Sequence, residues 1–467
     1  MRYSLLNFIF CPCCGGELTS VSLEEIITED NSDSREVFNE TNKKQEEIIS
    51  EVNNDSNEVF NRINKKNDPG EVTNITNKKD DPREVSNITD KKNDHNDVIN
   101  RNSSDVLNRI NNISAVIGPV PSFRRKTSFT KVLTKYSSSP YLRDGKQDID
   151  NIDVKKGLLV CGECGHWYPV SNFVPELLPD HLRDWEKDVK FLSEFSESLP
   201  KKLYKKLTKM VKSFQKEKDR ITDKAQDYKK AEISIKDKIT DEEFFEPGYS
   251  SPFNEDDPEF TQNLIKRFSL VLPLLELKKN HIILDVGSGY SWTTEWLMKM
   301  GFESIGVDIC RTYIDIGIER MRNIRPHLIV ADVENMPIKD ASINSILCYD
   351  SFHHIPNRKA AMAHFFRVLK EDGLVALAEP GQEHEQAQVS IEVMEKYGIL
   401  EKGIEAEDIK AYCEGLDFMP PEQYFMLKFH HEEQGKVLTS KFIKSHSLVE
   451  CNIFVIRKRS EGEEGGT

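Results

Sequence analysis

Four cysteines of the chain form two pairs with metal-binding spacing. The first pair is Cys11 and Cys14, the second is Cys161 and Cys164, and a glycine follows each pair. Two thiols at this spacing face each other across a tight turn, and the glycine lets backbone N–H groups approach the sulfurs. The pattern predicts one zinc ion held by four thiolates, with Cys13 as a bystander. The alternative is a redox pair or unpaired buried cysteines, but both pairs share the same strand-knuckle-glycine context.

A second group of residues follows an apolar strand in the C-terminal half. The stretch 281–291 contains Asp285-Val-Gly287-Ser-Gly289 and runs into a helical segment. Gly287 suits a tight turn, and Gly289 lets the backbone approach a ligand over the strand end. Ser291 stands where a dinucleotide-binding loop would have its third glycine, and an acidic side chain here would repel a pyrophosphate. The loop therefore favours a cationic or amine-bearing ligand.

More carboxylates stand at or near the ends of the strands that follow. Asp308 lies about 20 residues downstream of the glycine loop, where a carboxylate can accept hydrogen bonds from both hydroxyls of a ribose. Asp332 ends another apolar strand and Asp350 comes just after the next, and a Lys-x-x-Gly turn precedes the last. This alternation of strands and helical segments predicts an α/β fold.

Taken in order, these motifs closely resemble the class I S-adenosylmethionine-dependent methyltransferases, in the broad group that methylates small molecules, lipids and glycans. The resemblance covers about 260–460. It implies a Rossmann-like seven-stranded sheet and S-adenosylmethionine as cofactor. The implied cofactor-binding residues are Asp285, Gly287 and Gly289 for the methionine moiety, Asp308 for the ribose, and Asp332 with the backbone of Val333 for the adenine, with Met336 nearby.

The same resemblance places residues 348–354 in front of the methyl group. Methyl transfer is an in-line displacement, so positioning of the acceptor provides much of the rate. A hydroxyl acceptor also needs a base, and Asp350 and His353 are the candidate catalytic residues. The alternative is that these residues only shape the pocket, because a His-His-Ile sequence is widespread in this fold.

The cysteine segments carry a second resemblance. FCPCCGGEL and LLVCGECGHWYPV, followed by NFVPELLP, resemble the small zinc-ribbon proteins that activate methyltransferases, known as the activator subunit of eukaryotic tRNA and release-factor methyltransferases. The match covers about 1–20 and 155–180 and implies an internal contact between ribbon and methyltransferase domain. This chain departs from the family in one respect, because an insert, residues 21–154, separates its two cysteine pairs. Because the cost of loop closure grows only logarithmically with length, the insert does not put metal binding in doubt.

The insert contains a 13-residue repeat, read as SDSREVFNETNKK, NDSNEVFNRINKK, NDPGEVTNITNKK and DDPREVSNITDKK. About two apolar side chains in each repeat bury too little surface to offset the entropy of ordering the chain. We therefore predict that most of the insert is disordered. The alternative is a repeat that folds on a partner.

A helical linker or cap is predicted over 181–258, before the methyltransferase domain at 259–460. Its apolar stripe consists of Leu203, Leu207, Met210, Val211 and Phe214. Residues 201–230 contain 12 Lys/Arg against 4 Asp/Glu. We interpret the basic face as a solvated surface whose lysine stems cover apolar side chains. The alternative is a surface for a phosphate-bearing substrate or an anionic membrane.

Composition narrows the class of protein. The 467 residues carry a net charge of -15 with 37% hydrophobic residues, so the whole surface should not attract nucleic acid or anionic lipid. No run approaches the ~18 apolar residues of a membrane helix, and the first residues do not form a signal peptide. We expect a cytoplasmic protein without a membrane span.

Three functions remain open. The first is a methyltransferase of a small-molecule, glycan or lipid-linked acceptor, activated by its own ribbon. The stretch 379–404 favours it, since it resembles an insertion of methyltransferases from bacterial cell-surface polysaccharide pathways. The second is a methyltransferase of tRNA, rRNA or a translation factor. The sequence Cys-Tyr-Asp-Ser-Phe at 348–352 lacks the Pro-Pro clamp of adenine-N6 and glutamine-amide enzymes, but nucleic acid stays possible through the basic helix. The third, a noncatalytic scaffold, is disfavoured because all cofactor carboxylates are present.

Overall fold

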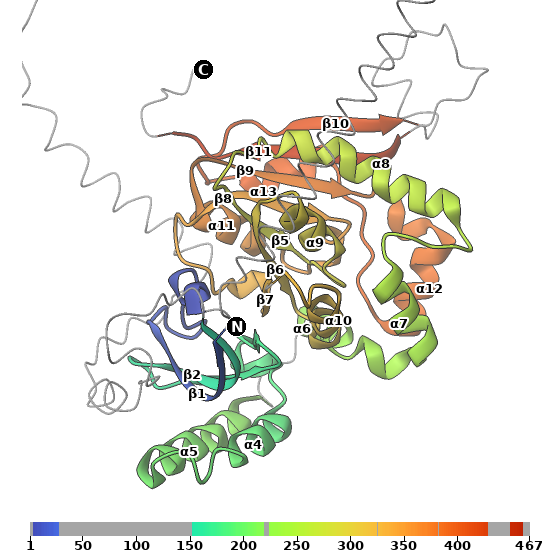
Figure 1. The fold of residues 1–467 in the computed structure, drawn as a ribbon. Helices are drawn as coiled ribbons and strands as arrows, with labels where there is room; N and C mark the ends of the chain where they lie inside the picture. Colours follow the sequence, from blue (N-terminus) through green and yellow to red (C-terminus); the bar gives the residue numbers. More distant parts are fainter. Residues whose placement is uncertain are drawn as a thin grey trace, which may run out of the picture. The chain divides into compact units, whose positions relative to one another are not determined.

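The protein is described by a computed structural model that covers residues 3–27, 152–218, 224–324, 326–381, 383–427 and 449–460. The predicted disordered repeat lies outside these ranges. The described residues form a small antiparallel sheet and a seven-stranded sheet with helices (Figure 1). In these ranges no helix combines the length and the apolar character that crossing a bilayer requires.

The N-terminal sheet is built from both cysteine segments. Its four strands, in the order β1-β2-β3-β4, are β1 (Leu18–Ile27), β2 (Ile152–Cys161), β3 (Trp167–Ser171) and β4 (Val174–Pro175), preceded by the 3-10 helix η1 (Tyr3–Asn7). Pairing of β1 with β2 from Leu18↔Cys161 to Ile27↔Ile152 carries both strands beyond the predicted ribbon bounds of 20 and 155. The domain boundaries otherwise stay predictions.

The second half of β2 is buried on both faces, which explains the apolar run from Leu158 to Cys161. Leu159 and Cys161 belong to a core shared with the C-terminal domain, whereas Leu158 and Val160 pack against helices. Successive side chains of a strand point to opposite faces, so one strand serves two cores.

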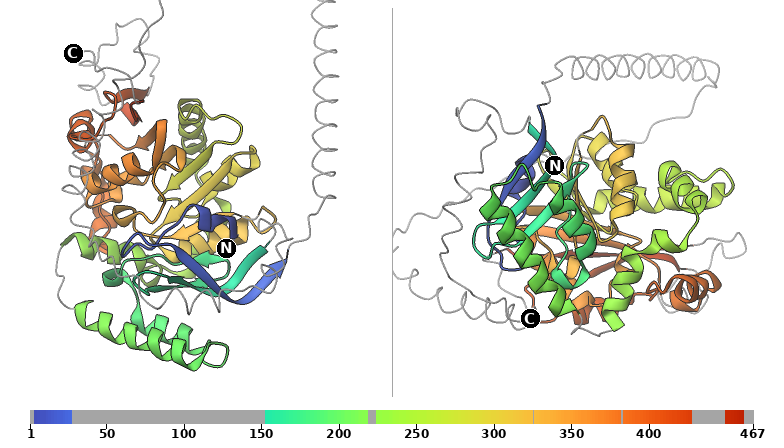
Figure 2. Two further views of the ribbon diagram at one scale, coloured as in Figure 1. Left: turned by 90° about the vertical axis from the view of Figure 1, so that its left-hand side faces the viewer. Right: turned by 90° about the horizontal axis from the view of Figure 1, so that it is seen from below.

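Helices α4 and α5 cover the second face of β2. The elements of the predicted linker are η3 (Asp180–Leu182), α4 (Trp185–Ser193), α5 (Lys201–Lys218), α6 (Lys224–Ile233), η4 (Ile235–Lys238) and α7 (Asp241–Ser250). Leu203, Leu207 and Val211 of the predicted stripe are buried with Leu158 and Trp167. Figure 2 shows α4 and α5 side by side along the ribbon sheet. Leu203, Leu207 and Val211 are therefore core, and Lys201, Lys202 and Lys205 of α5 are exposed.

The predicted seven-stranded sheet is confirmed. Its order is β10-β11-β9-β8-β5-β6-β7. Strands β7, β6, β5, β8 and β9 are parallel, and β11 runs antiparallel to both of its neighbours, β9 and β10. The bounds are β5 (Ile282–Val286), β6 (Glu303–Asp308), β7 (His327–Val330), β8 (Ile343–Tyr349), β9 (Leu369–Glu379), β10 (Glu422–Leu427) and β11 (Val449–Arg457). The chain reverses strand order between β5 and β8. A crevice at such a reversal, at the carboxyl ends of the strands, is where α/β sheets bind ligands.

Helices cover both faces of this sheet. Helices α8 (Pro258–Leu274) and α9 (Trp292–Lys299) share a core with one face, and α11 (Arg358–Val368) and α13 (Ala406–Cys413) with the other. The remaining elements are α10 (Arg311–Arg320), η5 (Val333–Asn335), η6 (Phe352–His354), η7 (His384–Gln386) and α12 (Gln388–Tyr397).

The ribbon is joined to the edge of the large sheet by backbone hydrogen bonds. Lys339 donates to the carbonyl of Phe8 at 2.7 Å, and Leu177 donates to that of Val330 at 2.7 Å. Glu176 also forms a parallel β-bridge with Val330, the last residue of β7. Because β7 is an edge strand, the bond from Leu177 satisfies a carbonyl of β7 that would otherwise be unpaired. The predicted contact between ribbon and C-terminal domain is present.

Candidate functional site

The four knuckle cysteines converge on one point. The Sγ atoms of Cys11 and Cys164 are 3.7 Å apart, and those of Cys14 and Cys161 are 3.5 Å apart. All four sulfurs lie within 4.8 Å of one another. Sulfurs at ~2.3 Å from a tetrahedral zinc would be about 3.8 Å apart, so this set fits zinc. The ion would be held by these four residues and would stabilise the fold of the ribbon.

The backbone of the two knuckles is shaped by glycines. Gly15 and Gly165 have φ of 73° and 78°, a region that favours glycine. A Cβ on Gly16 would lie 2.9 Å from the Sγ of Cys161, so the first knuckle has no room for a side chain there. The steric restriction thus falls on Gly16, one position after the glycine that directly follows the first pair.

His166 is a neighbour of the sulfurs that the sequence did not single out. Its Nδ1 lies 3.2 Å from the Sγ of Cys164, and its Nε2 lies 2.9 Å from a carboxylate oxygen of Asp180. Cys13 completes a second group of potential ligands with Cys164 and His166. Cys13 is exposed whereas Cys11 and Cys161 are buried, so the four-cysteine set is the more enclosed site.

The glycine loop lies where the sequence predicts it. The N–H of Gly287 donates to the carbonyl of Val307 at 2.8 Å and holds the loop against β6. Gly287 has a φ of 66°, and a Cβ there would lie 2.4 Å from that of Ser351. Gly289 has a φ of 49° with open space beside it. Both glycines line a cavity, so the loop can approach a ligand closely.

Asp308 ends β6 and lines the same cavity. One of its carboxylate oxygens accepts the N–H of Gly289 at 2.8 Å, and the other accepts that of Cys310 at 2.8 Å. Burial raises the pKa of Asp308 to about 6. Above that pH the side chain is an oriented carboxylate with remaining acceptor capacity, as contact with a ribose requires.

Asp285 takes a different position from the other carboxylates. It accepts hydrogen bonds from the hydroxyls of Thr293 and Thr294, both at 2.6 Å, and is absent from the residues that line the cavity. Burial raises the pKa of Asp285 to about 6. Here the carboxylate ties the glycine loop to α9, and its contact with the methionine moiety stays a prediction.

Asp332 and Val333 line the far end of the cavity, as predicted for the adenine. The carboxylate of Asp332 is already engaged. It accepts hydrogen bonds from Lys229 Nζ at 2.8 Å, the N–H of Glu334 at 3.0 Å and Asn335 Nδ2 at 3.0 Å. Of about four lone-pair directions, one remains for an exocyclic amine. The roles of Asp332 and Val333 stay predictions.

Two residues of α6 enter this cavity, although the sequence placed them in a linker. Lys229 is 4% exposed and pairs with Asp332. Burial, together with the nearby carboxylates of Asp308 and Glu401, raises the pKa of Glu232 to about 8. Neither residue carries a recognisable signal in the sequence, because both stand in a lysine-rich amphipathic helix.

At the acceptor end, the structure places His354 rather than His353 in the cavity lining, together with Asp350. Burial and the neighbouring positive charge of His353 lower the pKa of His354 to about 4, so its ring is neutral at pH 7. Its Nδ1 lies 2.8 Å from the carbonyl of Leu400, which can only accept. The Nε2 of His354 therefore carries the lone pair.

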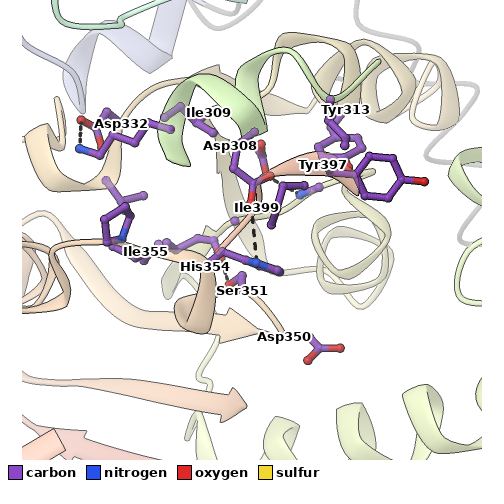
Figure 3. A pocket seen from close by; sticks show the side chains of 18 of the residues that line it. Asp308, Ile309, Tyr313, Asp332, Asp350, Ser351, His354, Ile355, Tyr397 and Ile399 are labelled. Carbon is purple, nitrogen blue, oxygen red and sulfur yellow. Dashed lines mark hydrogen bonds and ion pairs between the residues drawn. The ribbon is translucent and has the colours of Figure 1, made fainter. Parts of the chain in front are cut away.

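Asp350 is oriented by a cation. Arg267 donates to its carboxylate at 3.1 Å, and Asp350 adopts a φ of 55°. Burial alone would raise the pKa of Asp350, but Arg267 and His353 outweigh it and hold the pKa below its usual range. Figure 3 shows Asp350 apart from Asp308 and Asp332. A carboxylate with a lowered pKa is a weak base, and the catalytic roles of Asp350 and His353 stay predictions.

The cavity has a volume of about 430 Å³, within the range of pockets that bind small molecules and cofactors. Helical elements outside the sheet contribute apolar side chains to it, namely Ile235 and Ile239 at η4, Val393 and Tyr397 from α12, and Ile399. The polar side chains come from the strand ends. This division suits a cofactor with an apolar cover and specific polar contacts, and the residues present fit S-adenosylmethionine.

Comparisons with known proteins agree with both halves of this arrangement. Residues 284–377 match the family model described as "Methyltransferase domain", and residues 2–172 match the model described as "Trm112p-like protein". Among curated proteins, the methyltransferase GfsG of Streptomyces halstedii is 28% identical over 139 residues, which are 29% of this chain and 48% of GfsG. The chain thus matches about half the length of this relative.

Two further similarities complete the comparison. An uncharacterized protein of Methanocaldococcus jannaschii is 23% identical over 43% of this chain and 83% of its own length. A solved complex that contains the Haloferax volcanii Trm112 methyltransferase activator is 16% identical with a TM-score of 0.37, covering 47% of this chain and 99% of the matched chain. The matched segments therefore identify a class I S-adenosylmethionine-dependent methyltransferase domain and a Trm112p-like module in the same polypeptide.

Proposed function

We propose that the protein methylates a small-molecule, glycan or lipid-linked acceptor, and that its Trm112p-like ribbon activates the methyltransferase domain within the same chain. The observation that carries the proposal is the cover of the cavity. Glu232 and Ile235, from α6 and η4, line it together with Asp308, and Val393 and Tyr397 of α12 line it as well. A pocket covered by the chain's own helices favours a small acceptor or the reactive end of a larger one.

Different residues of the chain would bind the cofactor and the acceptor. S-adenosylmethionine, when bound, supplies an electrophilic methyl group. Asp308 and the glycine loop would orient the cofactor, and Asp350 and His354 would face the acceptor. Methyl transfer depends on holding the acceptor atom in line and close, so exclusion of water by the apolar cover contributes to the rate. The neutral Nε2 of His354 is available to accept a hydrogen bond from an acceptor hydroxyl and so to orient it.

The ribbon would act through the edge strand β7. The hydrogen bond from Leu177 to Val330 lies two residues before Asp332, and the bond from Lys339 to Phe8 lies a few residues after it. Asp332 and Val333 line the cavity between these two anchors. A folded ribbon therefore restrains the loop that we assign to the adenine, and loss of the ribbon would free it.

A methyltransferase of RNA or of a translation factor is the second candidate. The observation that favours it is the basic surface of α5, where Lys201, Lys202, Lys205, Lys206 and Lys209 are exposed. Such a row of lysines can neutralise phosphates. Helix α5 packs on the ribbon, however, and none of these lysines lines the cavity. The small-acceptor proposal is therefore preferred.

Reversing three charges on α5 should separate the two candidates. In the variant Lys202→Glu/Lys205→Glu/Lys206→Glu, formation of S-adenosylhomocysteine from a small acceptor or glycan extract should stay within about twofold of wild type, because surface substitutions of this kind change stability little. Turnover on tRNA and its salt-dependent binding should fall if RNA is the substrate. A parallel loss of both tRNA turnover and tRNA binding would contradict the proposal. Exposed Lys187→Glu and Lys190→Glu on α4 serve as controls for charge.

The acceptor end of the cavity gives a second prediction. His354→Gln and Asp350→Asn should each lower kcat by about 10- to 100-fold while the dissociation constant of the cofactor changes only a few-fold, because these side chains face the acceptor. Steady-state kinetics and calorimetry measure the two quantities separately. Equal losses of cofactor affinity and turnover would instead place the substituted residue in the cofactor site.

A further inference from the structure

Three potential metal ligands meet beside the acceptor end of the cavity. They are His353, His384 and Glu401, and one ligand atom from each lies within 4.8 Å of the others. Nε2 of His384 is 2.7 Å from Oε2 of Glu401, and Nε2 of His353 is 3.4 Å from the same oxygen. The three residues come from η6, η7 and the segment before α13, so the tertiary fold brings them together.

His353 is oriented by a buried carboxylate. Its Nδ1 lies 2.8 Å from Oε2 of Glu379, which is 0% exposed. Glu379 in turn accepts backbone N–H groups of Ser351, Phe352 and His353 at 2.9 to 3.3 Å. With Nδ1–H donated to Glu379, the Nε2 atom faces Glu401, and an ion bound there would take the place of the proton that Nε2 carries in the imidazolium form. A carboxylate behind the distal nitrogen of a ligating histidine is the arrangement that fixes ring orientation in metal sites.

The second histidine approaches at right angles to the first. The rings of His353 and His384 are 5.0 Å apart between centroids, with an interplanar angle of 85°. Both Nε2 atoms point toward Glu401, although the two side chains differ in exposure, with 4% for His353 and 26% for His384. The cluster is thus walled by protein on the His353 side and open on the His384 side, which leaves an entry path for an ion.

From this convergence we propose that His353, His384 and Glu401 bind a divalent transition-metal ion. Two imidazole nitrogens and one carboxylate on one side of an ion form a ligand set that suits such metals and leaves further positions open. This site is separate from the cysteine ribbon in both residues and donor chemistry. Nitrogen and oxygen donors accept Mn²⁺ or Fe²⁺, whereas thiolates select softer ions.

The surroundings of the cluster supply negative charge. Besides Glu379, Oε1 of Glu401 faces Nδ1 of His354 at 3.8 Å. Among groups packed against the cluster, Arg358 donates to the backbone carbonyls of Phe352, His353 and Lys402 rather than to the carboxylates. A dication is therefore electrostatically favoured next to Glu379 and Glu401.

The position of Glu401 connects the site to the cavity. Glu401 lines the cavity with Asp350 and His354. If the proposed methyl transfer is correct, the ion would hold an oxygen of the acceptor near the reacting atoms and lower the pKa of that hydroxyl. Binding of the ion itself does not depend on the acceptor, so the site can be tested without one.

The test is a titration with Mn²⁺ of the full-length protein loaded with one equivalent of zinc, which fills the thiolate site, and electron paramagnetic resonance measures the free Mn²⁺. Mn²⁺ is the weakest divalent binder of the first-row series and should leave zinc in the thiolate site. We expect one bound Mn²⁺ per chain. His384→Gln and Glu401→Gln should each weaken binding by at least about tenfold. His281→Gln, at the opposite end of β5, and exposed Glu407→Gln should bind as wild type.

A loss of metal binding can be distinguished from a loss of folding. His384 is partly exposed, so His384→Gln should retain the wild-type unfolding temperature and cofactor affinity. If the wild-type protein leaves all Mn²⁺ free, the cluster is a hydrogen-bonded network and the proposal is wrong. If the cluster variants bind Mn²⁺ as tightly as the two controls, the ion lies elsewhere and the proposal is equally wrong. Either result leaves methyl transfer itself intact.

Discussion

In the variant Asp308→Ala, the dissociation constant of S-adenosylmethionine should rise by about 10- to 150-fold. The ribose hydroxyls would lose a charged acceptor, and hydrogen bonds to charged groups contribute about 1.5 to 3 kcal/mol. Asp308 also accepts the N–H groups of Gly289 and Cys310, so alanine would leave these donors unpaired and loosen the glycine loop. Isothermal titration calorimetry with the ligand-free protein measures the change.

Two variants separate the charge of Asp308 from its shape. Asp308→Asn keeps an oxygen for a backbone donor but removes the charge, and should weaken binding by less than Asp308→Ala. Exposed Asp256→Asn, which makes the same change of charge away from the cavity, should bind as wild type. Wild-type affinity in Asp308→Ala would rule out the ribose assignment.

The pH dependence of cofactor binding provides an independent check on Asp308. Burial raises the pKa of this side chain to about 6 in the ligand-free protein. Hydroxyl donors bind its ionised form, so the contribution of Asp308 to affinity should be constant above pH 7 and should fall as the pH drops through about 6. Asp285 has a similar pKa and Glu232 one of about 8, so both also titrate in this region. The part of the pH profile that disappears in Asp308→Asn belongs to Asp308.

The strand ends of the large sheet could be predicted because they carry local signals. Gly287 must adopt a positive φ against Ser351, and Asp308 stands at a fixed separation from it at the end of the next parallel strand. Both features lie in short segments, and the sequence shows their apolar strands and their glycines directly. The same holds for the cysteine knuckles, where Gly16 packs on the sulfur of Cys161.

The cover of the cavity could not be predicted in this way. Lys229 and Glu232 belong to a helix whose sequence reads as a solvated face, and only tertiary packing against Asp332 and His354 places them in the cavity. Tertiary packing also decides whether His353 or His354 lines the cavity. Neighbouring residues on one short helix point in different directions, and Glu379 from β9 draws His353 away from the cavity.

Replacing Cys161 with serine should remove the zinc of the ribbon. One of the four sulfurs would be lost from a buried tetrahedral site, and metal binding in small zinc modules is coupled to their folding by roughly 10 to 16 kcal/mol. Zinc content should fall from one to near zero per chain when it is measured in a His384→Gln background, where the second proposed site is disabled. Inductively coupled plasma mass spectrometry after gel filtration gives the ratio.

The loss of zinc should extend to the methyltransferase domain. Cys161 and Leu159 belong to the same core as Ile329 and Val286 of the large sheet, and the ribbon is bonded to Val330 next to the loop of Asp332. We therefore expect Cys161→Ser to lower the unfolding temperature of the whole described unit and to weaken cofactor binding. Cys13→Ser is the matched control and should retain both zinc and cofactor. If Cys13→Ser loses zinc while Cys161→Ser keeps it, the ligands are Cys13, Cys164 and His166, and the four-cysteine assignment is wrong.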